Sequence, residues 1–217
     1  MQIIALISQK GGVGKTTLCI HLATAFVADG YNTLLLDLDP QASAAEWKDA
    51  RESEEPAVLA VPPSRLPKVI EEARKIGTDI MIIDTAPHSE GTALDAARVA
   101  DVVLVPCQPS IMDIRAMRKT VDLLSHVKKP IYAILNGVAP HGSDADEAAK
   151  AITIQFKLKT SPVRIGERVA YNRCLITGQA AQEFEPGGKA SQEIMEFYKW
   201  ARNLVNMSSS KKEKVVA

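Results

Sequence analysis

The stretch SQKGGVGKTTLC (residues 8–19) decides the fold, because it joins the end of an apolar run to the start of a helical pattern. Its closely spaced glycines let backbone N–H groups turn inward around an anion, and the start of the helix adds the positive end of a dipole. The pattern predicts a phosphate-binding loop between a strand and a helix. It departs from the usual G-x-x-x-x-G-K-[ST] spacing at one place, where Gln9 stands at the first glycine and Lys10 follows it.

We expect this loop to hold the phosphates of a nucleotide. Lys15 is placed to reach the β- and γ-phosphates, Thr16 to offer its hydroxyl to Mg²⁺, and Thr17 to contact the α-phosphate. The alternative, a glycine-rich turn without a ligand, is disfavoured by the position of Gly-Lys-Thr at the start of the helix. The backbone part of the predicted site consists of Gly11, Gly12, Val13 and Gly14.

Outward from the loop, apolar runs alternate with helical patterns. Near-continuous Val, Ile and Leu runs are typical of strands buried on both faces of a parallel sheet. The strands are expected at 3–8, 33–39, 79–85, 101–107 and 130–137, and the helices at 16–29, 65–75, 114–127 and 191–205. This alternation predicts an α/β fold: one doubly wound, mostly parallel sheet with helices on both faces.

We expect a single domain over residues 1–206 and a disordered tail over 207–217. Residues 50–57 and 139–148 have the composition of exposed loops. The last helix places apolar residues on one stripe, which fits a membrane-surface helix or, better, a helix packed on the sheet.

The composition indicates a protein of the reduced cytosol that does not insert stably in a membrane. The three cysteines form no C-x-x-C pair, so the sequence predicts neither a disulfide framework nor a cysteine zinc site. No apolar run approaches the roughly 18 residues that a membrane span needs. The formal net charge is zero, yet residues 1–108 carry −6 and residues 109–217 carry +6. This asymmetry fits an uneven solvated surface or a basic face that meets nucleic acid.

Acidic residues follow two of the apolar runs, where a metal–phosphate site would need them. LLLDLDPQ places Asp37 and Asp39 on the same side of an extended strand. MIIDTAP places Asp84 after buried positions, where a carboxylate is costly without a cation nearby. We expect Asp84 to act on Mg²⁺ through a water, with Asp39 as a further metal candidate and Asp37 the less certain of the three.

The segments KGGVGKTT, DLDPQ, IIDTAP and VPCQPS, in this order, resemble the ParA/MinD family of deviant Walker ATPases. The resemblance covers nearly the whole chain. It is strongest to the small ParA-type partition ATPases that lack an N-terminal helix-turn-helix domain, because the first predicted strand here starts at residue 3.

The resemblance implies roles for individual residues. Lys10 would be the signature lysine, which reaches the ATP of the other subunit in a dimer that forms with ATP. Asp39 would position the attacking water and Asp84 would be the Walker B acid. Asn136 resembles the position that recognises adenine, and residues 105–115 resemble the proline-rich dimerisation segment. ATP and Mg²⁺ are the implied cofactors, with slow intrinsic hydrolysis.

The family divides by what the ATP dimer binds, and the +6 half favours nonspecific DNA over membrane. The segment RIGERVAYNR (164–173) resembles the region that holds DNA-contacting arginines. The candidate contacts are Arg168 first, then Arg164 and Arg173, with Lys199 and Arg202 on the last helix. The implied protein is cytoplasmic, is nucleoid-associated in the ATP state, and has a ParB-like or other adaptor that stimulates hydrolysis and a plasmid or other cargo.

Two alternatives remain open at this point. One is a membrane-surface positioning switch like MinD, although the tail SSSKKEKVVA has no apolar face. The other is an enzyme on the same scaffold, either a nitrogenase-type reductase or a carboxylate ligase. The reductase would need two cysteines per subunit at the dimer axis, and Cys107 has no partner in the required context.

Overall fold

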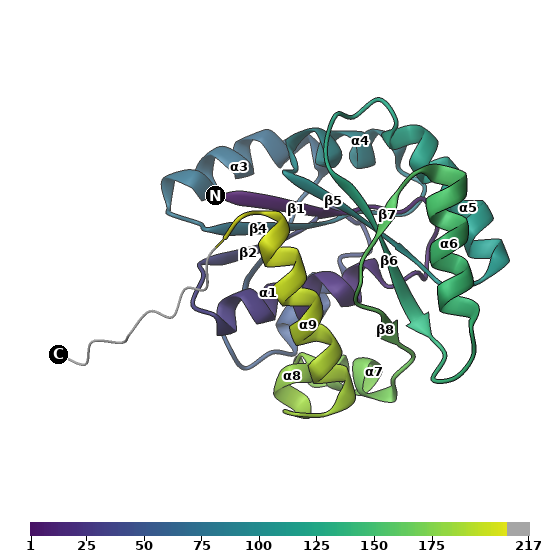
Figure 1. Cartoon of the computed structure of the whole chain (residues 1–217). Coiled ribbons are helices and arrows are strands. Elements are labelled where there is room, and N and C mark those ends of the chain that lie inside the picture. Colours follow the sequence, from purple (N-terminus) through teal and green to yellow (C-terminus); the bar gives the residue numbers. More distant parts are fainter. Residues whose placement is uncertain (208–217) are drawn as a thin grey trace.

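The computed structural model describes residues 1–207, so residues 208–217 of the expected tail lie outside the described part. A single eight-stranded sheet runs through the molecule in the order β3-β2-β4-β1-β5-β6-β7, with β8 paired to β6 (Figure 1). Every strand pair is parallel. The strands are β1 (Gln2–Leu6), β2 (Thr33–Asp37), β3 (Ala57–Ala60), β4 (Ile80–Asp84), β5 (Val102–Cys107), β6 (Ile131–Val138), β7 (Lys159–Thr160) and β8 (Ile165–Gly166).

Helices cover both faces of the sheet, which confirms the predicted doubly wound α/β fold. They connect the parallel strands as crossovers. The α-helices are α1 (Lys15–Ala28), α2 (Ser43–Asp49), α3 (Leu66–Lys75), α4 (Glu90–Val99), α5 (Ile111–Leu124), α6 (Asp144–Phe156), α7 (Val169–Ile176), α8 (Ala181–Phe184) and α9 (Lys189–Leu204), and a 3₁₀ turn spans Pro63–Arg65.

The core has two halves, one on each face of the sheet. Ile4 and Leu6 of β1 point toward α1 and α9, whereas Ile3 and Ala5 of the same strand point toward the side of α3, α4 and α5. All four side chains are at most 1% exposed. Alternate residues of a strand point to opposite faces, so an all-apolar strand supplies both halves at once.

The last helix packs on the core, as the preferred interpretation of its apolar stripe predicts. Ile194, Phe197, Tyr198 and Ala201 of α9 are buried in the same half of the core as α1. Among residues 1–207, no helix is long and apolar enough to cross a membrane.

One loop prediction is wrong in part. Residues 139–148 were expected to be an exposed loop, but α6 begins at Asp144. Asp144, Asp146 and Glu147 occupy its first turn, where acidic side chains stabilise the positive end of a helix. Several short elements were also not predicted, namely α2, α4, α7, α8, β3, β7 and β8.

Candidate functional site

The predicted phosphate loop connects β1 to α1 at the carboxyl edge of the sheet. Gly12 and Gly14 adopt left-handed backbone conformations, with φ of 74° and 89°. Gly14 precedes α1, and a Cβ there would lie 2.2 Å from Nδ2 of Asn136. Only glycine therefore fits at residue 14, on grounds of both φ and space.

Asn136 lies at the carboxyl half of β6 and its side chain supports the loop. Its Nδ2 donates a hydrogen bond to the carbonyl of Val13 over 2.7 Å. A backbone carbonyl that is held in this way fixes the turn before Gly14. The adenine contact expected of Asn136 stays a prediction, and the bracing of the loop is a role that the sequence did not indicate.

Lys15 is the first residue of α1, and it is only 6% exposed. Burial lowers the pKa of Lys15, while the carboxylates of Asp84 and Asp39 act in the opposite direction. Its Nζ lies 3.4 Å from the carbonyl of Lys10, so the side chain curls over the loop. A buried cation that folds back over a glycine-rich loop is suited to an anionic ligand.

Asp84 ends β4 beside the start of α1. The Thr16 hydroxyl donates to its Oδ2 over 2.5 Å, but its buried Oδ1 has no hydrogen-bond partner among residues 1–207. Burial raises the pKa of Asp84 to about 7, and the charge of Asp37 adds to this shift. A hydroxyl and an incompletely paired carboxylate are oxygen donors of the kind that Mg²⁺ and its waters accept. The residues present therefore fit the predicted magnesium site.

The two acids after β2 have different surroundings. Asp37 is buried and accepts hydrogen bonds from the backbone N–H groups of Asp39 and Ala44, so it ties the strand to the first turn of α2. Burial raises the pKa of Asp37. Asp39 is half-buried, and its Oδ1 accepts the N–H of Gln41. Asp37 thus has a structural role here, while Asp39 is the more accessible carboxylate.

The second lysine of the loop is paired with a carboxylate on α5. Nζ of Lys10 lies 2.6 Å from Oδ1 of Asp113, on α5. The backbone N–H of Gln9 donates to Oγ1 of Thr120 on the same helix. Asp113 lies inside the predicted dimerisation segment 105–115, but its pairing with Lys10 was not predicted. The sequence signals only the start of the helix here, because Ser110 and Asp113 have the spacing of a capping box.

The five candidate DNA contacts fall into two groups. Arg164 pairs with Asp146, Arg168 with Glu193 and Arg202 with Asp29. By contrast, Arg173 and Lys199 are exposed and form no ion pair within residues 1–207. All five stay predictions as DNA contacts.

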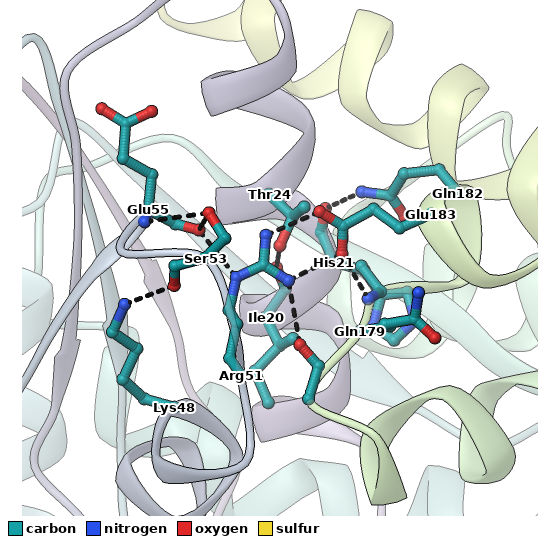
Figure 2. A network of polar contacts seen from close by, with 12 residues as sticks. Ile20, His21, Thr24, Lys48, Arg51, Ser53, Glu55, Gln179, Gln182 and Glu183 are labelled. Carbon is teal, nitrogen blue, oxygen red and sulfur yellow. Dashed lines mark hydrogen bonds and ion pairs between the residues drawn. The ribbon is translucent and has the colours of Figure 1, made fainter.

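A polar network joins the α2–β3 connection to α8 (Figure 2). The Arg51 guanidinium donates to both carboxylate oxygens of Glu183 over 2.7 and 2.6 Å, and also to the carbonyls of Gly178 and Glu55. The Arg51 side chain is 5% exposed. Gly178 packs so closely that a Cβ there would lie 2.4 Å from the backbone of Arg51. The network therefore locks the region after α2 onto the C-terminal helices.

His21 connects the same helices to the phosphate-loop helix. Its Nδ1 lies 2.6 Å from the Thr17 carbonyl, and its own carbonyl accepts from Nε2 of Gln182. Its Nε2 lies 3.6 Å from Sγ of Cys174. Complete burial lowers the pKa of His21 to about 4, so this ring is neutral at pH 7 and its role is structural.

Known proteins of two kinds are similar in sequence. A carboxysome distribution protein A of Gloeobacter kilaueensis is 34% identical over 122 residues, which cover 55% of each chain. The chromosome-partitioning ATPase Soj of Thermus thermophilus is 30% identical over 154 residues, covering 58% of this chain and 62% of Soj. The chain thus spans less than two thirds of the length of these relatives.

Solved structures share the fold over nearly the whole chain. The ATP complex of a Cyanothece McdA variant has a TM-score of 0.76 at 16% identity, covering 96% of this chain and 97% of that one. The Mg-ADP complex of MinD from Pyrococcus horikoshii has a TM-score of 0.74 at 20% identity, covering 94% and 96%. At these identities the likeness establishes the fold alone.

The model of the CobQ/CobB/MinD/ParA nucleotide binding domain matches residues 4–180. This is most of the chain, and it includes the phosphate loop, Asp39 and Asp84. The chain therefore belongs to the CobQ/CobB/MinD/ParA family of nucleotide-binding domains.

Proposed function

We propose that the protein is an ATP-dependent dimerising switch that binds DNA nonspecifically in its ATP state and positions a cargo. The observation that carries the nucleotide part is the buried, half-paired carboxylate of Asp84 beside Thr16 and the buried ammonium of Lys15. Such an arrangement is costly unless a magnesium-bound polyphosphate completes it. The names of the ATPase Soj and of the McdA–ATP complex support ATP as the nucleotide.

The positions of the remaining charged residues support ATP hydrolysis as the reaction. Mg²⁺, held through Thr16 and Asp84, would neutralise charge that develops on the phosphoryl oxygens. Asp39 orients the water that attacks the γ-phosphorus, and the bond to the bridging oxygen of ADP breaks as phosphate leaves. Lys15 holds the β- and γ-phosphates from the same subunit. Lys10 of a second subunit adds positive charge at the transition state, the task that an arginine finger performs elsewhere.

Dimerisation makes ATP a switch. In such a dimer, the γ-phosphate of each ATP is contacted by Lys10 of the other subunit. When this phosphate leaves after hydrolysis, the contact is lost and the two subunits dissociate. We infer a slow intrinsic rate and an adaptor protein that stimulates it. The similarity to a chromosome-partitioning protein and a carboxysome distribution protein supports a positioning role and leaves plasmid, chromosome and protein assembly as candidate cargoes.

DNA binding is proposed from the +6 charge of residues 109–217. Nonspecific binding depends on neutralised phosphates and weakens steeply with salt. The exposed Arg173 and Lys199 can meet a phosphate without breaking an ion pair. Arg168, Arg164 and Arg202 would have to exchange a carboxylate for a phosphate, which costs more for the half-buried pairs than for an exposed one.

The decisive experiment measures DNA binding with ATP, with ADP and without nucleotide over a series of salt concentrations. We expect binding in the ATP state alone, with a slope that reports several phosphate contacts. Equal binding in all three states would refute the switch. Lys10→Ala is expected to bind ATP but to lose dimerisation and adaptor-stimulated hydrolysis, and normal stimulated hydrolysis in that variant would refute the role of Lys10 in trans.

The same samples separate this proposal from the membrane alternative. Because MinD shares the fold at nearly the same TM-score as McdA, the fold alone does not choose between DNA and membrane. Co-sedimentation with anionic liposomes in ATP, abolished by deletion of residues 206–217, would favour a MinD-like switch. The reductase alternative is disfavoured because Cys19 and Cys174 are buried in the opposite half of the core, so Cys107 has no second cysteine beside it in the described part of the chain to share a cluster.

A further inference from the structure

Lys10, which the proposed function assigns to the phosphates of a second subunit, is already engaged within its own chain. It forms the 2.6 Å ion pair with Asp113, whose side chain is 5% exposed, while its own side chain is 38% exposed. Lys10 also lines a surface cavity of 380 Å³ together with Met112 and Lys119. The ammonium can therefore leave Asp113 through solvent without any opening of the core.

The first turn of α5 holds Asp113 independently of Lys10. Ser110 caps the helix: its Oγ accepts the backbone N–H of Asp113 and donates to Oδ2 of the same residue. Asp113 is the third residue of α5, where the positive end of the helix favours a carboxylate. If Lys10 leaves, Asp113 therefore keeps its hydrogen bond from Ser110 and the favourable field at the start of α5. The ion pair can thus break without leaving an unpaired buried charge, so Lys10 is able to exchange Asp113 for another anion.

We propose that Asp113 is an internal counter-ion that competes with the triphosphate of the second subunit for Lys10, and that it thereby sets the threshold for ATP-dependent dimerisation. The inference rests on the proposed role of Lys10 in trans. While paired, Lys10 contributes little net charge toward a second subunit, because the two charges largely cancel at a distance. When the triphosphate of a second subunit approaches, the ammonium exchanges one anionic partner for another. Asp113 is thus a positioning residue that acts through Lys10.

The test compares Asp113→Asn with the wild-type chain. We expect the dissociation constant of the dimer, measured by analytical ultracentrifugation with a non-hydrolysable ATP analogue, to fall roughly two- to thirty-fold, the range for two partly exposed ion pairs, one from each subunit. With ADP it should stay unchanged. Asp113→Ser serves as a second variant if the asparagine perturbs α5. Ser110→Ala is the matched control, since it removes the helix cap but keeps the carboxylate, and it should not strengthen the dimer.

A second measurement reads the pair directly. Acylation of Lys10 by an amine-specific reagent, followed by mass spectrometry without nucleotide, should be faster in both Asp113 variants than in the wild type or in Ser110→Ala. If the Asp113 carboxylate only stabilises the first turn of α5, the reactivity of Lys10 will be the same in all four proteins, and that result would overturn the proposal.

The outcomes distinguish this inference from the function on which it rests. If both Asp113 variants dimerise no better than wild type while Lys10→Ala still fails to dimerise, the counter-ion role is refuted and the role in trans stands. If Lys10→Ala dimerises normally, both fail. In the double variant Lys10→Ala/Asp113→Asn, any gain in dimerisation over Lys10→Ala would also overturn the proposal, because Asp113 would then act without Lys10.

Discussion

The nucleotide end of the molecule and its C-terminal third place their charges in different settings. At the nucleotide end, Lys15 is buried with a lowered pKa, and one oxygen of Asp84 has no hydrogen-bond partner in the described part of the chain. In residues 144–204, the half-buried Arg168 and Arg202 are each matched by a carboxylate. An unmatched buried charge stabilises a bound ligand at the expense of the fold, whereas a matched pair leaves little to gain from a ligand. Buried charges that the fold leaves incompletely paired therefore mark the functional site.

The strongest test of the comparison is Lys15→Ala. Loss of a charge-assisted contact to two phosphates should weaken ATP binding by on the order of 3 kcal/mol, about a hundred-fold. Unfolding should not become easier, because the substitution also removes a desolvated charge. Titration calorimetry measures the ATP affinity and thermal unfolding measures the stability. Lys15→Arg is the control that keeps the charge. An ATP affinity within a factor of three of wild type would contradict the claim that the buried Lys15 charge serves ligand binding.

His21 tests the boundary between the two regions. Its pKa is about 4 in the folded state and about 6.5 when unfolded, so the unfolded chain takes up the proton first as pH falls. This contribution to stability is complete above pH 6.5 and is lost progressively down to pH 4, by at most about 3 kcal/mol. Urea unfolding at pH 7 and pH 4.5 measures it. His21→Gln should show a shallower dependence on pH, and an equal slope would contradict the prediction.

Arg51 tests whether a matched pair holds the C-terminal helices in place. Arg51→Met should cost about 2–3 kcal/mol of unfolding free energy, because it leaves Glu183 without its guanidinium, and solvent access to Glu183 keeps the cost at the lower end of the usual range. Denaturant unfolding measures the loss. The double variant Arg51→Met/Glu183→Leu should recover part of it, since both charges are then gone. No recovery would mean that the backbone contacts of Arg51 matter more than the pair.

The smallest effect is expected at the exposed pair of Arg164 with Asp146. The Asp146 side chain is 61% exposed and the Arg164 side chain is 38% exposed, so solvent screens the pair. Arg164→Ala should leave the midpoint of thermal unfolding unchanged within error. A clear drop in the midpoint would show that the stability of the C-terminal third depends on this pair. Solvent-exposed pairs would then have to be counted beside the buried unmatched charges and the half-buried matched pairs. The same variant, read for DNA binding, gives the contribution of Arg164 to the proposed interface.

The five long central strands and the position of the glycine-rich loop before α1 were predictable from the sequence, because these depend on local patterns. The residues of the loop are consecutive, and Asp84 follows a fully apolar run. Elements with a weaker pattern were not predicted: β3 has three exposed residues of four, and the first turn of α6 is polar enough to be taken for a loop.

Contacts between distant residues account for the rest. Lys10 meets Asp113 across 103 positions, and Arg168 meets Glu193 across 25. A single sequence identifies such residues as charged but not as partners. Asn136 is a similar case: its place after an apolar strand was predictable, while the close approach of its amide to Gly14 depends on how β6 sits beside β5 in the sheet.

The packing of α9 on α1 has a consequence for how the protein is made. Phe26 of α1 meets Tyr198 edge to face at 4.8 Å, and Asp29 accepts from Arg202 over 3.0 Å (Figure 1 shows α9 lying across α1). The helix that follows the phosphate loop is thus synthesised well before the helix that covers it. A chain still on the ribosome before residue 204 emerges exposes the apolar side of α1. Chains that end before α9 lack the cover of α1, so we expect them to be less stable than the full chain and to be cleared by proteases.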